Sequence, residues 1–247
     1  MRARQLFLES LLAHDVTMFF GNPGSTENAV VDGLFEFDAL RYILALHEGV
    51  AVGAATFYAQ ASGKTPMVNL HAGPGLGNGI GMIYGALRAN VPMIVTAGQQ
   101  DTRMRMREPV LSHDLAAMAA PVVKFSMQIE QADEVSQAVR LAYKIANEAP
   151  KGPVFLALPL NVMEQETDAA LQGPGAIFHA AADAAGIKRA AEILAGASKP
   201  IIVAGDGVAQ AGASDAVGRL AELTGAEIWF EPSRGRYPVA ADHRCVR

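Results

Sequence analysis

Short apolar runs alternate with longer helix-like stretches along most of the chain, and this alternation is the feature that most limits its possible folds. The runs are rich in Val, Ile, Leu, Met and Phe, which is typical of buried parallel strands. They lie at residues 16–20, 42–46, 66–70, 91–97, 122–125 and 153–158. The clearest helix is expected over 131–148, where the apolar residues form one stripe. The pattern predicts an α/β fold with a doubly wound parallel sheet.

The chain changes character after this region. Residues 166–186 are rich in Ala, contain Gly173-Pro174-Gly175 and show little periodicity, which indicates a linker. We therefore predict one α/β domain over 1–165 and a second over 187–247. Its expected elements are a helix near 187–197, a strand at 200–204, a helix near 213–224 and a strand at 227–230. Because two strands and two helices are too few for an independent α/β domain, we expect this domain to be incomplete and the chain to be truncated within it.

Composition excludes several classes of protein. Of the 247 residues, 51% are hydrophobic and 18% charged, so a large core is expected rather than disorder. The net charge of −5 argues against a nucleic-acid partner. Cys245 is the only cysteine, so an intrachain disulfide is impossible. No run approaches the ~20 apolar residues of a membrane helix, and no secretory signal follows Met1. We expect a cytoplasmic protein with neither nucleic acid nor membrane as partner.

Glu48 follows one of the predicted strands and begins a stretch of small and apolar residues. This position predicts a carboxylate at a strand-to-helix junction with interior surroundings on both sides. A buried carboxylate is costly unless a partner shares its charge or its proton. No Lys or Arg lies between Arg41 and Lys64. We therefore expect the partner of Glu48 to be a bound ligand rather than a side chain.

Two further segments have the same character. Residues 20–27 read Phe-Gly-Asn-Pro-Gly-Ser-Thr-Glu, and residues 69–79 read Asn-Leu-His-Ala-Gly-Pro-Gly-Leu-Gly-Asn-Gly. Junctions of this kind cluster at the carboxyl edge of a parallel sheet, where open α/β folds bind ligands. With Glu48 between them, these segments resemble the pyrimidine-binding domain of thiamine-diphosphate enzymes. The resemblance is clear over residues 1–165, continues more weakly to the end of the chain, and is greatest to the benzoylformate decarboxylase branch of that family.

The resemblance implies catalytic roles for three side chains. The carboxyl group of Glu48 matches the glutamate that contacts N1′ of the cofactor's aminopyrimidine, a role that requires a carboxyl group in a dry site. His71 matches a histidine that exchanges protons with the substrate-derived intermediate, for which a near-neutral pKa is suitable. Ser25 matches a residue that hydrogen-bonds the substrate carboxylate. Its sequence position is equally suitable for a helix N-cap.

The resemblance also implies which residues contact the cofactor, thiamine diphosphate. Besides Glu48 these are Pro23, Gly24, Gly73, Pro74, Gly75 and Asn78. The glycines would let a helix start approach the cofactor closely, and the absence of a strict GxGxxG disfavours a dinucleotide. Residues 98–100, Gly-Gln-Gln, lie near the cofactor or a subunit contact by the same resemblance, or form a polar loop.

No metal ligands are expected in this chain. Family members bind Mg²⁺ and the diphosphate through Gly-Asp-Gly followed by an Asn, but after Gly205-Asp206-Gly207 no Asn occurs. Because Mg²⁺ needs several oxygen ligands, we interpret residues 205–207 as a turn and expect Mg²⁺ to be bound by a domain absent from this chain. The remaining histidines show no metal-ligand spacing; these are His14, His47, His113, His179 and His243.

The expected activity is the non-oxidative decarboxylation of a small 2-oxo acid by a homodimer or tetramer. His71 favours this reaction, whereas the Gly-Pro-Gly at 73–75 resembles acetolactate-synthase-like carboligases. A third reading is a non-catalytic assembly module.

In the family the cofactor lies between subunits, so the face at 48–60 and 74–88 is expected to contact a second subunit. Small and apolar residues would pack there, namely Ala51, Ala54, Ala55, Gly81 and Ile83. Residues 1–247 alone are expected to be inactive.

Overall fold

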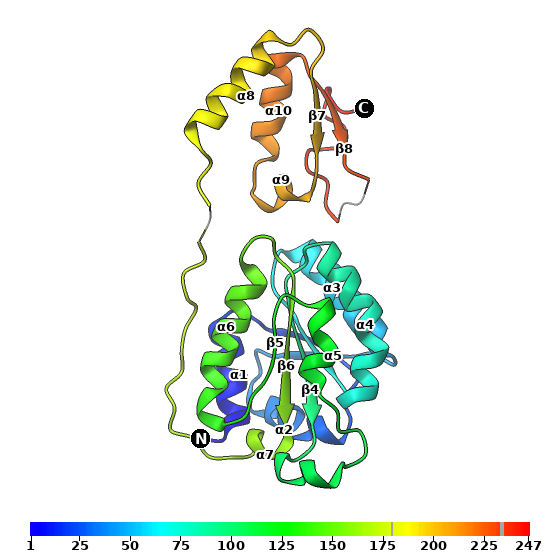
Figure 1. The fold of residues 1–247 in the computed structure, drawn as a ribbon, viewed down its shortest axis with the longest axis vertical. Coiled ribbons are helices and arrows are strands. Elements are labelled where there is room, and N and C mark those ends of the chain that lie inside the picture. Colours follow the sequence, from blue (N-terminus) through cyan, green and yellow to red (C-terminus); the bar gives the residue numbers. More distant parts are fainter. Residues whose placement is uncertain (179, 233–234) are drawn as a thin grey trace. The chain divides into compact units, whose positions relative to one another are not determined.

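The computed structural model describes residues 1–178, 180–232 and 235–247, which divide into two compact units (Figure 1). Unit 1 spans residues 1–178 and unit 2 spans residues 179–247. Unit 1 contains a six-stranded sheet of order β2-β1-β3-β4-β6-β5, in which every strand pair is parallel. The strands are β1 (Met18–Gly21), β2 (Arg41–Leu44), β3 (Met67–Leu70), β4 (Met93–Gln99), β5 (Ser126–Gln128) and β6 (Pro153–Pro159).

Helices cover both faces of this sheet, as Figure 1 shows. On one face lie α1 (Ala3–Ala13), α2 (Asn28–Gly33), α6 (Val135–Asn147) and α7 (Leu160–Met163). On the other lie α3 (Glu48–Ser62), α4 (Ala72–Arg88) and α5 (Leu115–Ala119). Short 3₁₀ helices are found at Ser25–Glu27, Leu34–Glu36, Thr102–Arg107, Ala120–Val122 and Ala132–Glu134. The predicted α/β fold with a doubly wound parallel sheet is confirmed.

Each face of the sheet has its own hydrophobic core, because side chains alternate along a strand. Phe19 on β1 and Met67 on β3 contribute to the core under α1 and α6. Their neighbours Phe20 and Val68 contribute to the core under α3 and α4. The predicted apolar stripe of α6 is buried in the first core except for Ile145, which is partly buried. The two cores hold the strand ends, and the loops that follow them, in fixed positions.

One predicted strand is wrong in position. The apolar run at 122–125 lies outside β5, which covers Ser126–Gln128 instead. Residues Ala120–Val122 form a 3₁₀ helix that contains Pro121. All three residues of β5 are half-buried, because β5 lies at the edge of the sheet. An edge strand needs fewer apolar residues than a central one, so the apolar run was a poor guide here.

Unit 2 contains a pair of parallel strands, β7 (Ile201–Ala204) and β8 (Glu227–Phe230). Its helices are α8 (Ala184–Gly196), α9 (Asp206–Gln210) and α10 (Ser214–Thr224). The turn predicted at 205–207 is wrong, since Asp206 begins a short helix there. Its carboxylate accepts hydrogen bonds from the backbone N–H groups of Gly235 and Arg236 at 2.8–3.0 Å. These contacts give the Asp206 carboxylate a structural role.

Part of the predicted linker packs on unit 1. The Thr167 hydroxyl donates to Asp133 at 3.0 Å, and the backbone N–H of Gln172 donates to the Ser136 hydroxyl at 2.7 Å. His179 lies outside the described residues. The linker boundaries at 166–186 stay a prediction. Among the helices that the structure describes, none has the length and apolar character needed to cross a membrane.

Candidate functional site

The candidate site lies where the loops after β1 and β3 separate. These strands are neighbours in the sheet, but the chain leaves β1 toward α2 and leaves β3 toward α4 on the opposite face. Such a switch point opens a crevice at the carboxyl ends of the strands, which is the usual ligand position in open α/β sheets. The loop after β2, which leads to Glu48, ends at the same edge.

Glu48 is the first residue of α3 and is only 6% exposed. Its carboxylate accepts hydrogen bonds from the side-chain amides of Asn22 at 3.2 Å and Asn78 at 3.0 Å. These residues belong to the loop after β1 and to α4, so the carboxylate joins all three segments singled out from the sequence. The expectation that no side chain would partner Glu48 is therefore wrong: amides take the place of Lys or Arg.

The surroundings of Glu48 favour its ionised form. Burial by itself would raise the pKa of this carboxyl group. The hydrogen bonds from Asn78, from the backbone and from Asn22, together with nearby His47, outweigh burial and leave the pKa lower than that of an ordinary glutamate. At neutral pH, Glu48 is thus a carboxylate that can accept a further hydrogen bond, since its two oxygens offer about four acceptor positions.

His71 precedes α4 and is held by a second carboxylate. Its Nδ1 atom lies 2.8 Å from Oε2 of Glu27 and 3.3 Å from the Thr26 hydroxyl. Glu27 is 1% exposed and also accepts from the backbone N–H groups of Gly24 at 2.7 Å and Gly98 at 2.8 Å. A carboxylate acceptor at Nδ1 requires a proton there, so Nε2 is the ring nitrogen available for other chemistry.

Several glycines allow these groups to approach the backbone. A Cβ atom added at Gly24 would lie 2.2 Å from Nδ1 of His71, and one at Gly98 would lie 2.3 Å from Glu27 Oε1. A Cβ atom at Gly75 would lie 3.1 Å from Glu48 Oε1 and 3.3 Å from the His71 Cβ atom. The site therefore depends on glycine for close packing rather than for unusual backbone dihedral angles.

The other predicted site residues lie around this centre. Ser25 is exposed and starts a 3₁₀ helix, and Gly24 rather than Ser25 occupies the N-cap position, so the capping interpretation is wrong. Pro23 is half-buried beside Gly24. Gly73 and Pro74 lie in the first turn of α4, with Gly73 half-buried and Pro74 exposed. Asn78 lies in the same helix and reaches Glu48.

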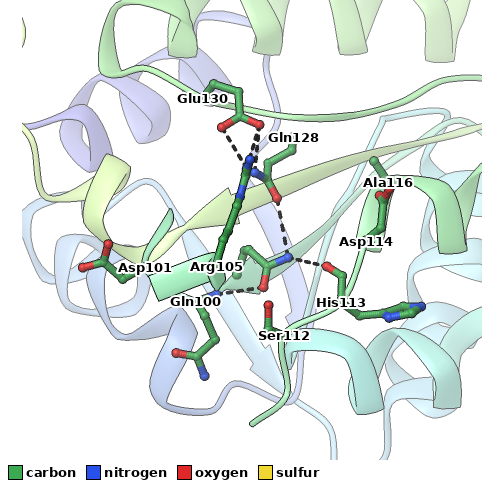
Figure 2. A pocket seen from close by; sticks show the side chains of 10 residues that line it. Gln100, Asp101, Arg105, Ser112, His113, Asp114, Ala116, Gln128 and Glu130 are labelled. Carbon is green, nitrogen blue, oxygen red and sulfur yellow. Dashed lines mark hydrogen bonds and ion pairs between the residues drawn. The ribbon is translucent and has the colours of Figure 1, made fainter. Parts of the chain in front are cut away.

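A separate cavity of about 550 Å³ lies beyond the ends of β4 and β5 (Figure 2). In Figure 2, Arg105 extends toward Glu130, which accepts from it at 2.9 and 3.0 Å. The buried amide of Gln99 donates to the carbonyl of His113 at 2.6 Å and accepts from the backbone N–H of Gln100 at 2.9 Å. The side-chain amide of Gln100 donates to the carbonyl of Val110 at 3.0 Å, so both glutamines of the 98–100 segment hold the loop that lines this cavity.

Sequence reasoning missed two residues of the site. Glu27 was noticed only as the end of a motif, although it joins the loop after β1, the junction of β3 with α4 and the end of β4. Asn22 was likewise part of a motif without a role, although it contacts Glu48. Local sequence carries little signal for either, because their partners come from distant segments. Among the described residues, no group of three or more His, Cys, Asp or Glu side chains could hold a metal ion.

Comparison with known proteins gives a consistent result. The family model described as "Thiamine pyrophosphate enzyme, N-terminal TPP binding domain" matches residues 1–133, and the central-domain model of the same family matches 187–247. Benzoylformate decarboxylase of Pseudomonas aeruginosa is 37% identical over 246 residues, which cover 97% of this chain and 46% of the relative. Acetolactate synthase large subunit of Lactococcus lactis subsp. lactis is 30% identical over 217 residues, covering 85% of this chain and 37% of the relative.

A solved structure is similar over the full chain. The thiamine diphosphate-dependent 4-hydroxybenzoylformate decarboxylase of Rhodococcus jostii RHA1 superposes with a TM-score of 0.89 at 31% identity. The match covers 100% of this chain and 47% of that one. The chain thus spans less than half the length of each of these three relatives.

Proposed function

The chain belongs to the thiamine pyrophosphate enzyme family, and we propose that unit 1 forms the aminopyrimidine half of the active site of a thiamine-diphosphate-dependent 2-oxo acid decarboxylase. The observation that carries this proposal is the position of Gly75 between Glu48 and His71. Even a methyl group at Gly75 would come within 3.1 Å of Glu48 Oε1 and 3.3 Å of the His71 Cβ atom. A ligand group that contacts Glu48 would therefore also lie close to His71.

The residues present are suitable for an aminopyrimidine. Glu48 is a buried carboxylate whose pKa is held down by hydrogen bonds despite its burial. Asn22 and Asn78 fix its orientation and leave acceptor positions unused. A ring nitrogen that carries a proton is the natural partner of such a carboxylate. The missing side chain at Gly75 lets the start of α4 pack closely against Glu48 and His71.

The roles of the chain's own residues follow from these contacts. Thiamine diphosphate, when bound, supplies the carbanion chemistry of the reaction. Glu48 would hold or exchange a proton with the ring nitrogen N1′. His71 would use Nε2 to give or take a proton on the substrate side, because Glu27 holds Nδ1. Ser25, exposed at the start of its 3₁₀ helix, would donate a hydrogen bond to the substrate carboxylate.

A carboligase of the acetolactate synthase type is the second candidate. The Gly73-Pro74-Gly75 start of α4 is the observation that favours it. We prefer a decarboxylase because the His71–Glu27 pair provides a proton donor and acceptor at the site. Both reactions release CO₂ from a 2-oxo acid. They differ in the other product, which is a free aldehyde for the decarboxylase and, after addition to a second 2-oxo acid, a 2-hydroxyketo acid for the carboligase.

The proposal assigns the diphosphate and its Mg²⁺ to another domain and places a second subunit against α3 and α4. Large apolar side chains are exposed on these helices, namely Val50 at 61%, Phe57 at 71%, Met82 at 43% and Tyr84 at 54%. Of the small residues expected at this contact, Ala51, Ala55 and Ile83 instead belong to the core of unit 1. The larger exposed side chains would therefore make the subunit contact.

Titration of the chain with thiamine, followed by NMR, tests the binding half of the proposal. We expect signals of Glu48, Gly75 and Asn78 to shift, and Glu48→Gln to weaken binding at least about tenfold, which is the effect of a lost charge-assisted hydrogen bond. Unchanged spectra at millimolar thiamine would contradict the proposal.

A second experiment separates decarboxylase from carboligase. The C-terminal region of the Pseudomonas relative is produced separately and added to the chain, and CO₂ and ligated products formed from 2-oxo acids are then measured.

A further inference from the structure

A row of polar side chains crosses the sheet beneath the candidate site. The Tyr42 hydroxyl on β2 donates to Oδ1 of Asn69 on β3 at 3.2 Å, and Nδ2 of Asn69 donates to the Thr96 hydroxyl on β4 at 3.1 Å. The Thr96 hydroxyl in turn donates to the carbonyl of Val68 at 3.2 Å. Asn69 and Thr96 are fully buried. Asparagine is disfavoured in strands, so this position calls for a reason beyond packing.

Gly21 allows the row to cross β1, which lies between β2 and β3. A Cβ atom at Gly21 would lie 2.2 Å from the Tyr42 hydroxyl oxygen and 2.4 Å from the carbonyl oxygen of Asn69. The Tyr42 hydroxyl therefore rests directly on the last residue of β1. Burial raises the pKa of Tyr42, and the negative charge of Glu27 raises it further, so the hydroxyl keeps its proton and remains a donor.

The residue after Gly21 connects this row to the site. The backbone N–H of Asn22 donates to the carbonyl of Asn69 at 3.2 Å. The side chain of Asn22 then donates to Oε1 of Glu48 at 3.2 Å. The Asn69 backbone and the Tyr42 hydroxyl thus fix the backbone at Gly21 and Asn22. The Asn22 side chain extends from this fixed backbone to Glu48.

We propose that Asn69, supported by Tyr42 and Thr96, is a positioning residue that fixes Asn22 and, through Asn22, orients the Glu48 carboxylate. A fully satisfied buried polar row stiffens its surroundings, since any displacement leaves a donor or acceptor unpaired. An apolar residue at position 69 would fill the space without this directional constraint. The importance of the row for catalysis rests on the proposed function, but its effect on Glu48 does not.

The test measures the pKa of Glu48 in the 247-residue chain, from the ¹³C shift of its carboxyl carbon. Asn22→Ala removes the donor itself and should raise the pKa of Glu48. Asn69→Leu and Tyr42→Phe leave Asn22 in place but should raise the Glu48 pKa in the same direction. Both variants remove side-chain hydrogen bonds of the row but keep the carbonyl of residue 69. Loss of roughly one hydrogen bond should make local opening easier, so hydrogen exchange at the backbone N–H of Asn22 should become about tenfold faster.

A buried asparagine elsewhere in unit 1 provides the matched control. Asn147 accepts from the Thr65 hydroxyl at 3.1 Å and donates to the carbonyl of Tyr143 at 3.0 Å. Asn147→Leu should lower stability to urea without changing the Glu48 pKa or Asn22 exchange. If Asn69→Leu does not fold, Tyr42→Phe, which removes one hydroxyl, decides the question.

Two outcomes would overturn the proposal. In one, the Glu48 pKa rises in Asn22→Ala but stays at its wild-type value in the folded variants at 69 and 42. In the other, Asn22→Ala itself leaves the Glu48 pKa unchanged. Neither outcome depends on a cofactor, whereas failure to bind thiamine would contradict the proposed function alone.

Discussion

Nδ1 of His71 lies 2.8 Å from Oε2 of Glu27, although 44 positions separate the two residues in the chain. Glu27 is 1% exposed, so this carboxylate has almost no water to stabilise its charge. Its oxygens accept instead from His71, from the Thr26 hydroxyl and from three backbone N–H groups, those of Gly24, Ala72 and Gly98. One side chain thereby joins the loop after β1, the start of α4 and the end of β4.

Glu27→Ala should destabilise unit 1 strongly. The substitution leaves buried backbone donors and His71 without an acceptor, and breaking such a buried polar pair costs about 3–5 kcal/mol of unfolding free energy. Urea denaturation measures this change. The control is Glu130→Ala, because Glu130 forms an exposed ion pair with Arg105 and its loss should cost less than about 1 kcal/mol. Equal losses in the two variants would contradict the assigned role of Glu27.

The glycines of α4 should respond differently to alanine. At Gly81 no atom lies within 4 Å of an added Cβ, so Gly81→Ala should stabilise the helix by up to about 1 kcal/mol. At Gly75 the added methyl group would press on Glu48 Oε1 at 3.1 Å. Gly75→Ala should therefore weaken thiamine binding, while Gly81→Ala leaves it unchanged. Binding by calorimetry and stability by urea titration measure the two effects, and equal thiamine affinity in both variants would refute the close-approach argument.

The fold was largely predictable from the sequence because most of its strands are buried. The apolar runs before Gly21 and around Val68 and Val95 mark β1, β3 and β4, whose side chains are almost all buried. β5 was misplaced because it lies at the sheet edge and carries polar residues. The other edge strand, β2, was located by the apolar run at 42–46, but the predicted burial of that run is wrong, because Ile43, Leu44 and Leu46 are exposed at the sheet edge. The pattern of apolar residues is thus a reliable guide to burial only for the central strands.

The candidate site was only partly predictable, for a different reason. The position of Glu48 at a strand-to-helix junction follows from local pattern and is confirmed by the start of α3. The predicted interior surroundings on both sides are wrong in part, because Leu46 and Val50 are exposed. Its amide partners Asn22 and Asn78 lie 26 and 30 positions away. Hydrogen bonds of this kind depend on the register between strands and on helix orientation, which no local window of sequence contains. Glu27 was missed for the same reason.

His14 should make the stability of unit 1 depend on pH. Burial lowers the pKa of His14, the hydrogen bond with the Ser10 carbonyl offsets part of this, and the charge of Arg140 lowers the pKa further. Its Nε2 atom is buried without a hydrogen-bond partner among the described residues. The folded state therefore prefers the neutral ring. Its stabilising effect is fully present above the ordinary histidine pKa of 6.5 and is lost as pH falls below it.

Urea denaturation at a series of pH values between about pH 5 and pH 8 measures this effect. As pH decreases below about 6.5, the unfolding free energy of the wild-type protein should fall, and this one group contributes a slope approaching about 1.4 kcal/mol per pH unit. His14→Phe keeps a ring beside Tyr143, which lies 4.9 Å from the His14 ring centre. This variant should show a shallower slope. An identical slope in both proteins would rule out His14 as the titrating group.

The exposed face of α3 should govern self-association. Phe57 is 71% exposed there, and Phe57→Glu places a charge on the proposed subunit contact. We expect the dissociation constant of the dimer to increase at least about tenfold, as for loss of a central apolar contact. Sedimentation velocity over a concentration series measures it. Phe35→Glu is the control, since Phe35 is 89% exposed but lies outside α3 and α4. A wild-type chain that stays monomeric at high concentration would remove support for this contact.

The central claim is that Glu48 activates the cofactor while His71 acts on the substrate. The most direct measurement is hydrogen–deuterium exchange at C2 of thiamine diphosphate, followed by NMR in an assembled enzyme that contains residues 1–247. Glu48→Gln keeps the size of the side chain but cannot share a proton with N1′, so exchange should slow by a factor on the order of 10²–10⁴ before any substrate is added. His71→Ala should leave this exchange nearly intact and depress only the turnover of the 2-oxo acid. Wild-type exchange in Glu48→Gln would contradict the account.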